Sequence, residues 1–151
     1  MSNMIQAARE QVAQLTQAAY EKAAAEGLLP AGAEVKATIE IPKDPTHGDY
    51  ASSFAMAGAK ALHKAPRQIA QTIVDHLDLA GTFFDKVEIA GPGFLNFTLG
   101  SKWYGQVLTD IQAEGNTYGK VDEGKGEKVM VEFVSANPTG PMHIGNARGG
   151  V

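Results

Sequence analysis

The stretch KVMVEFVSANPTGPMHIGN, residues 128–146, says most about the architecture of this chain. Its first seven residues are an almost wholly apolar run of strand length, which is typical of a parallel sheet buried on both faces. A loop rich in proline and glycine follows and ends at His143, where a helix is expected to begin. Free N–H groups and the positive dipole end of a helix favour an anion. The stretch therefore predicts a strand, a phosphate-binding loop and a helix.

The residues at the end of this loop have side chains that suit a phosphate. His143 can donate a hydrogen bond to a phosphate oxygen on which charge develops during transfer. Gly145 has no Cβ, so a planar group can approach its backbone closely. Asn146 can add an uncharged amide donor. A His-x-Gly triplet alone is often structural, whereas the whole string after a buried strand is much more specific.

Two boundaries follow from the composition around this stretch. Residues 114–127 contain four glycines and little apolar content, which indicates an exposed linker. Only eight residues follow His143, too few for the crossover that a second parallel strand requires. We therefore expect one domain over residues 1–115, a linker over 116–127, and the truncated start of a second domain over 128–151.

The first domain has clear helical and strand periodicities. Residues 4–26 predict a helix that ends at Gly27, and residues 34–41 alternate like a half-buried strand that ends at Pro42. Asp49 is expected to cap a helix over residues 51–62, in which Gly58 permits close packing, and Pro66 is expected to open another helix. The inward-facing residues are expected to be Ile5, Ala8, Val12, Leu15, Ala19, Val35, Ala37, Ile39, Ile41, Phe54, Ala55, Ala61, Leu62, Ile69, Ile73, Val74 and Leu77.

The remainder of this domain predicts a hairpin and a last helix. Residues 86–90 and 94–99 are two β segments joined by a tight Gly-Pro-Gly corner. Ser101 is expected to cap a helix with a buried stripe. That stripe consists of Tyr104, Val107, Leu108 and Ile111.

Composition restricts the class of protein. The 151 residues are 44% apolar and 20% charged, which is typical of a globular chain. The net charge of −4 argues against binding nucleic acid through a global positive field, so any RNA contact must be local. The absence of cysteine excludes disulfides and thiolate chemistry. With no signal-peptide core and no apolar run of membrane length, we expect a soluble, cytoplasmic protein.

Three strings together resemble the arginyl-tRNA synthetases, a family of class I aminoacyl-tRNA synthetases. Residues 131–149 are similar to the first class I signature, and DPTHGDYA (44–51) and VEIAGPGFLNF (87–97) are similar to two strings of the family's N-terminal additional domain. The resemblance covers essentially all of the chain. It implies an α/β fold: an α+β additional domain with a small, mainly antiparallel sheet packed by helices, then the first strand and loop of a Rossmann-like catalytic domain.

The resemblance also implies an activity. The full enzyme would be an arginine–tRNA ligase that uses ATP with Mg²⁺ to form arginyl-adenylate from L-arginine and then charges tRNA(Arg). His143, Gly145 and Asn146 are implied to bind ATP, with His143 and Asn146 catalytic, although Asn146 stands where the family usually has a second histidine. No tightly bound cofactor or protein-held metal is expected. The residues implied to hold arginine are Glu132, Ser135 and Asn137.

In this family the N-terminal domain is implied to touch the D-loop of the tRNA. Loop bases are commonly stacked on an aromatic side chain, so Trp103 is the predicted platform, with Gly100 and Ser101 as accessible backbone donors. A basic cluster is predicted to contact tRNA phosphates. It consists of Lys60, Lys64 and Arg67, with His63 beside them.

Each of these site predictions has an alternative. Trp103 can be a cover of the core, and the basic cluster a solvated surface. Glu132 can pair with Lys128 or Arg148 instead of a substrate. His47 is expected to fix its loop rather than to act in catalysis, because no nucleophile or base is evident beside it.

We expect the full enzyme to be monomeric and this fragment to be inactive, because the fragment lacks most of the catalytic sheet and the second class I signature. Two other functions stay open. One is a free-standing RNA- or protein-binding module whose residues 128–151 are dispensable. The other is a nucleotidyltransferase of the pantothenate or nicotinate adenylyl-ligase type, against which the two upstream strings argue.

Overall fold

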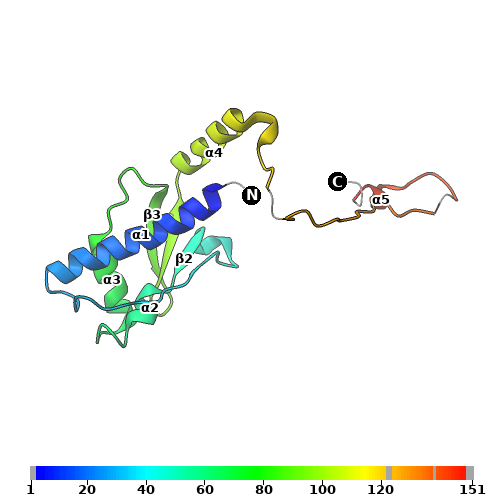
Figure 1. Ribbon diagram of the computed structural model, residues 1–151. Helices are drawn as coiled ribbons and strands as arrows, with labels where there is room; N and C mark the ends of the chain where they lie inside the picture. The colour runs from blue at the N-terminus through cyan, green and yellow to red at the C-terminus, as the bar shows by residue number, and fades with distance from the viewer. Residues whose placement is uncertain (1–2, 122–123, 138, 149–151) are drawn as a thin grey trace. The chain divides into compact units, whose positions relative to one another are not determined.

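The computed structural model describes residues 3–121, 124–137 and 139–148, which fall into two compact units. Unit 1 is Met1–Gly119 and unit 2 is Lys120–Val151. The division between them lies within the segment that the composition marks as a linker. Unit 1 contains a small sheet and most of the helices (Figure 1).

The sheet of unit 1 has four strands in the order β1-β2-β4-β3, and each neighbouring pair is antiparallel. The central strands are β2 (Tyr50–Ser52) and β4 (Phe94–Leu99). The edge strands are β1 (Ile39–Glu40) and β3 (Phe84–Ala90). A tight turn over residues 91–93 joins β3 to β4, which confirms the predicted hairpin and the predicted α+β class with a small antiparallel sheet.

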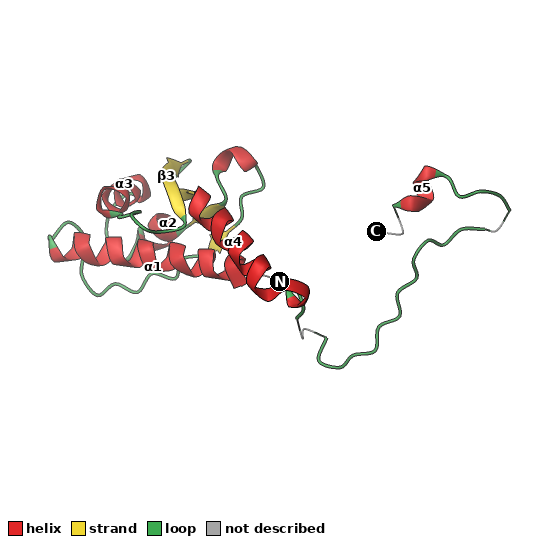
Figure 2. Cartoon of the chain, turned by 90° about the horizontal axis from the view of Figure 1, so that it is seen from above, coloured by secondary structure: helices red, strands yellow, loops and turns green. Residues whose placement is uncertain are grey.

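Helices cover one face of this sheet. They are α1 (Asn3–Ala25), α2 (Phe54–Gly58) and α3 (Pro66–His76), and their apolar residues form one core cluster with the sheet. Figure 1 shows α1 crossing in front of the strands, and Figure 2 shows the strands to one side of α1. As predicted, α1 ends near Gly27, Pro66 opens α3, and Gly58 packs closely, since a Cβ there would lie 3.2 Å from Val35.

The register of the strands separates a covered face from an open face. Residues directly opposite each other on neighbouring strands share a face. Tyr50 lies opposite Phe97, and both are buried in the core with Leu95. On the other face, Asn96 lies between Ala51 of β2 and Glu88 of β3. The alternate residues of β4 therefore point away from the helices.

The predicted strand over residues 34–41 is largely wrong. Only β1 forms, because β2 offers it just two pairing positions before the chain turns into α2 at Ser53. Val35, Ala37 and Ile39 still alternate as predicted and pack half-buried against the core. Ile41 lies beyond the pairing and is 59% exposed, so its predicted inward position is also wrong.

Asp49 does not cap a helix, and the predicted helix over residues 51–62 is replaced by β2 and the short helix α2. The carboxylate of Asp49 accepts a hydrogen bond from the backbone N–H of Leu99 at 2.8 Å, fifty residues further along the chain. The Asp49 N–H donates to the Phe97 carbonyl, also at 2.8 Å. These long-range bonds tie the segment to β4 as a strand, and local helix signals could not reveal them.

The last helix of unit 1, α4 (Ser101–Glu114), is in the predicted place, but two of its predicted details are wrong. Gly100, not Ser101, is its N-cap residue, and no side chain caps it. The expected buried stripe is mostly exposed: Leu108 is 62% exposed, and Tyr104 and Ile111 are exposed too. Ile5 of α1 is likewise exposed, because Met4 takes the buried position at that end.

In unit 2, the described residues contain one regular element, the short helix α5 (Ile144–Ala147). The strand predicted over residues 128–134 does not form, and its apolar side chains are exposed, up to 97% for Met130. A strand requires a hydrogen-bonded neighbour, and no described residue pairs with this run. The predicted helix start after His143 is confirmed.

Candidate functional site

A pocket of about 510 Å³ opens on the uncovered face of the sheet in unit 1. Its floor is Ala51 and Asn96, which are opposite each other on the two central strands. One wall is the segment from β1 to the 3-10 helix η1 (Pro45–His47), and the other is the β3–β4 turn with Phe94. We call this the sheet pocket. Its lining residues are Glu40, Pro42, Lys43, Asp44, His47, Ala51, Ala90, Gly91, Pro92, Phe94 and Asn96.

The Asn96 side chain is the unusual group in the sheet pocket. It is only 7% exposed, and its Oδ1 is buried without accepting a hydrogen bond from any described protein group. Burying an unpaired amide oxygen costs roughly 1–3 kcal/mol, so such atoms usually have a partner in the working state. Asn96 therefore contributes to the pocket floor an amide whose oxygen has no partner among the described residues.

The wall that carries His47 is held by its own bonds and by β4. The Asp44 carboxylate accepts hydrogen bonds from the Thr46 N–H at 2.9 Å and from the Thr46 hydroxyl at 2.7 Å. These bonds lower the pKa of Asp44, the side-chain bond most, so Asp44 stays charged. Gly48 has a φ of 80° and lies so close to β4 that a Cβ would be 2.8 Å from the Phe97 carbonyl oxygen. The role of fixing the loop, predicted for His47, is met by its backbone N–H, which donates to the Asp44 carbonyl at 3.0 Å, and not by its side chain, which forms no hydrogen bond or ion pair within the described residues.

The opposite wall is fixed by contact with α3. Gly93 in the hairpin turn has a φ of 140°, and a Cβ there would lie 3.0 Å from the backbone of Pro66, the first residue of α3. Arg67 follows directly and is exposed. The turn that forms this wall is thus held against the first residue of α3.

Trp103 lies elsewhere, half-buried at the start of α4. Its indole N–H donates to the Met4 carbonyl at 3.1 Å, and its ring meets Tyr104 edge-on at 5.1 Å. It also lines a second hollow of about 270 Å³ together with Ile5, Ile41 and Tyr50. These contacts agree with the alternative that Trp103 covers the core.

Gly100 does not offer the accessible donor expected of it. Its N–H already donates to the Phe83 carbonyl at 2.7 Å, and Gly100 itself is buried against Asp85. Ser101 is exposed in the first turn of α4. The N-terminus of α4 is thus partly closed by the start of β3.

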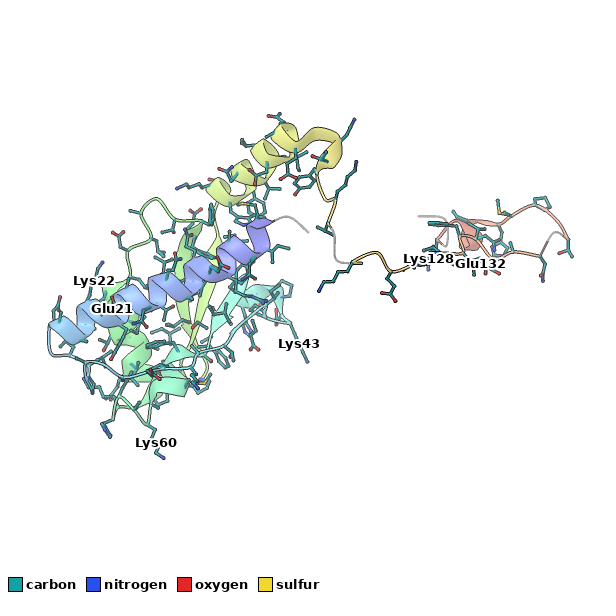
Figure 3. The ribbon with its side chains drawn as sticks, in the orientation of Figure 1. Glu21, Lys22, Lys43, Lys60, Lys128 and Glu132 are labelled. Carbon is teal, nitrogen blue, oxygen red and sulfur yellow. The ribbon has the colours of Figure 1, made fainter. Side chains whose placement is uncertain are left out.

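The residues of the basic cluster differ in their contacts. The Lys64 ammonium donates to the Leu28 carbonyl at 2.7 Å and so fastens the chain after α1. Lys60 and Arg67 are exposed and form no ion pair within the described residues. Figure 3 shows Lys60 projecting from unit 1. Lys60 and Arg67 therefore remain available to an anion.

Unit 2 brings together four of the residues expected to bind substrate. Ser135, Asn137, His143 and Asn146 line one hollow of about 370 Å³. Glu132, labelled with Lys128 in Figure 3, is exposed outside it and forms no ion pair with Lys128 or Arg148.

His143 and Asn146 hold each other in a reciprocal cap on α5. The Gly145 N–H donates to His143 Nδ1, and the His143 N–H donates to Asn146 Oδ1, both at 3.1 Å. Because Nδ1 accepts, a neutral ring carries its proton on Nε2, which can donate to an anion. The Asn146 side chain thus caps the helix, and the same side chain would also have to make any contact with a ligand.

The described residues contain neither a metal-binding cluster nor a membrane-spanning helix. No three of their His, Asp or Glu side chains are arranged to hold a metal ion. None of their helices combines the length and hydropathy that a bilayer crossing requires.

Sequence reasoning did not single out the sheet pocket. One available signal was a polar amide, Asn96, in the middle of a mostly apolar strand that alternates between two faces. Phe94, two positions earlier, must share its face. The pocket itself depends on a loop fifty residues away, and the sequence does not show that approach.

Unit 1 belongs to the class of small α+β domains, in which helices cover one face of an antiparallel sheet. The family model described as "Arginyl tRNA synthetase N terminal domain" matches residues 6–99. The chain belongs to this family.

Its curated relatives are arginine–tRNA ligases. That of Acetivibrio thermocellus is 49% identical over 150 residues and that of Caldanaerobacter subterraneus subsp. tengcongensis is 48% identical over 150 residues. Each alignment covers 99% of this chain and 27% of the relative. The Bacillus subtilis ligase is 49% identical over 111 residues, 74% of this chain and 20% of its own. The chain thus spans about a quarter of the length of these relatives.

A solved structure shares the fold. The crystal structure of arginyl-tRNA synthetase from Plasmodium falciparum superposes with a TM-score of 0.54 at 15% identity, over 68% of this chain and 18% of that chain. At this identity the likeness concerns the fold alone.

Proposed function

We propose that this chain is the N-terminal part of an arginine–tRNA ligase and that unit 1 binds tRNA(Arg) by taking a loop base into the sheet pocket. The buried, unpaired Oδ1 of Asn96 is the observation that carries this proposal. RNA-binding proteins commonly read splayed loop bases by hydrogen bonds to their edges and by stacking on aromatic rings. Asn96 supplies the acceptor and Phe94 supplies a ring in the same pocket.

The charges around the pocket favour a base over a phosphate. Glu40 and Asp44 line it with carboxylates, and Lys43 is its one lysine or arginine. A neutral base with N–H donors meets acceptors there, whereas a phosphate would be repelled. The tRNA phosphates are assigned instead to Lys60 and Arg67, which are exposed, with Arg67 beside the wall that Gly93 fixes to α3.

Unit 2 is assigned to the ATP and arginine sites of the same ligase. The shared hollow of Ser135, Asn137, His143 and Asn146 supports this assignment. His143 Nε2 would donate to the phosphate oxygens of ATP, and Mg²⁺ would arrive with the ATP. Glu132 would meet the arginine side chain as a carboxylate meets a cation. On this proposal the longer ligase forms arginyl-adenylate and charges tRNA(Arg), and these 151 residues alone do not.

The substitution Asn96→Leu tests the role of unit 1. It removes the amide at nearly constant volume, so we expect the dissociation constant for a tRNA(Arg) transcript to rise about 10-fold, as for the loss of a buried polar contact. The free energy of unfolding should stay the same or rise, because an unpaired polar group is removed. Filter binding and urea unfolding of the 151-residue chain measure the two quantities.

Thr98→Val is the matched control. Thr98 lies on the same face of the same strand but does not line the sheet pocket, so its loss should leave tRNA affinity unchanged. Equal affinities of Asn96→Leu and the unsubstituted chain for tRNA(Arg) would refute the proposed role of the pocket.

A further inference from the structure

We propose that His47 forms the second stacking wall of the sheet pocket, so that the RNA base lies between the rings of Phe94 and His47. This inference rests on the proposed function of the pocket. It adds a specificity-determining residue on the loop that approaches the sheet from the other side.

The two rings come from opposite walls. Phe94 belongs to the wall made by the β3–β4 turn, and His47 ends η1 in the wall that follows edge strand β1. They are the two aromatic side chains among the residues that line the pocket. The volume of about 510 Å³ falls within the range of roughly 300–1,000 Å³ that small-molecule sites occupy, so a base with its ribose fits.

The backbone that carries His47 is fixed before any ligand arrives. The His47 N–H donates to the Asp44 carbonyl at 3.0 Å, and Asp44 is itself bonded twice to Thr46. On the other side, Gly48 lies against Phe97 and Asp49 is bonded to β4 at both its N–H and its carboxylate. With the backbone fixed, only the side-chain torsions of His47 lose freedom on binding, which favours stacking.

The His47 side chain is also uncommitted. Within the described part of the chain it forms no hydrogen bond, ion pair or ring contact. Asp44 beside it stays charged, and Glu40 adds a second carboxylate to the lining, so an anion is disfavoured at this ring. The π-face of a histidine ring, in contrast, accepts any base.

The test pairs three variants with a set of RNAs. His47→Asn removes the ring, and His47→Phe keeps an aromatic face without an N–H. Phe133→Asn is the matched control, because Phe133 is an aromatic residue that is 65% exposed and lies outside the pocket. The probes are tRNA(Arg) transcripts in which each D-loop nucleotide in turn is abasic, and binding is measured with the 151-residue chain.

We expect His47→Asn to weaken binding of the intact transcript about 5- to 100-fold, the usual effect of losing one base–aromatic stack. His47→Phe should bind within about 3-fold of the unsubstituted chain, and Phe133→Asn should bind equally well. On the abasic transcript that loses sensitivity to Asn96→Leu, the His47→Asn effect should also vanish, because the stacked base is gone. Unfolding curves confirm that each variant is folded.

Three results would overturn the inference. These are no loss with His47→Asn, an equal loss with His47→Phe, or a His47→Asn effect that persists on the abasic transcript. Failure of the proposed function looks different: no abasic transcript would lose affinity, and Asn96→Leu would bind as well as the unsubstituted chain.

Discussion

Gly48 shows how much one residue contributes to the position of the His47 wall. Its φ of 80° lies in the region that side chains disfavour, and its Cα faces the Phe97 carbonyl with no room for a Cβ. Gly27, at the end of α1, has a similar φ of 74° but open space around it. Comparing an alanine substitution at each glycine therefore separates the cost of the dihedral angle from the cost of the steric clash.

Gly48→Ala is expected to lower the free energy of unfolding by about 3 kcal/mol, the sum of backbone strain and a forced separation of the loop from β4. Gly27→Ala should cost only about 1 kcal/mol, because the strained φ is its sole penalty. Urea unfolding of both variants measures the difference. Equal costs would show that the loop moves away from Phe97 without penalty.

At the scale of elements, α1 and α3 are joined at their C-terminal ends through His76. The ring accepts or donates at both nitrogens, with Nε2 3.1 Å from the Glu26 carboxylate and Nδ1 2.7 Å from the Thr72 carbonyl. Both partners are acceptors, so the protonated ring satisfies both. The bond to Glu26 foremost, and then that to Thr72, raises the pKa of His76 above its ordinary value.

This raised pKa predicts a pH dependence of stability with a definite sign. The protonated ring stabilises the fold fully below the unfolded pKa of about 6.5, and that contribution is lost as the pH rises through the higher folded pKa. The difference in urea midpoint between the unsubstituted chain and His76→Gln should therefore be larger at pH 5.5 than at pH 8.5. Glu26→Gln is the control and should reduce the difference, and a difference that grows with pH would contradict the assignment.

The elements also show which parts of the fold local sequence patterns can predict. The helices α1 and α3 and the β3–β4 hairpin follow from periodicity, Pro66 and the Gly-Pro-Gly corner, which are local signals. The segment around Asp49 could not be predicted in this way, because its bonds to Phe97 and Leu99 decide between strand and helix. The stripe on α4 has the correct period but no covering element in the described residues, so period alone did not predict burial.

The candidate site, too, could be predicted only where its residues are contiguous in the sequence. The loop residues from Ser135 to Asn146 were found from a contiguous string, and four of them do line one hollow. The sheet pocket draws on two stretches, residues 40–51 and 90–96, that lie some fifty residues apart, and its floor residue Asn96 was not selected. Trp103, the single tryptophan of the sequence, was predicted to stack on a base, but its indole N–H already donates to the Met4 carbonyl.

At the scale of the whole molecule, the two units are expected to separate tRNA contact from adenylation. The His143 ring belongs to unit 2, and the sheet pocket belongs to unit 1. A substitution in one unit should therefore leave the function of the other unchanged if the proposed division is correct.

His143→Ala in the complete ligase is predicted to lower the rate constant of arginyl-adenylate formation by about 100-fold, as for the loss of one donor to a developing charge. The dissociation constant for tRNA(Arg) should not change. Arginine-dependent ATP–pyrophosphate exchange and filter binding measure the two effects. Met142→Ala, an exposed neighbour in the same hollow, is the control and should retain exchange. If His143→Ala retains full exchange activity, the assignment of unit 2 to the ATP site is wrong.

The open face of the sheet has a consequence for how such a domain can change over time. Odd-numbered residues of β4 maintain the interior, whereas the even-numbered ones, Phe94 and Asn96 among them, face outward. Mutations at alternate positions of one strand are thus subject to separate selection: one set affects the packing of the core, and on the proposed function the other set affects the choice of RNA. On the same proposal, a lineage can change the nucleotide that it binds by exchanging the outward-facing side chains of β4, while the core residues of that strand are retained.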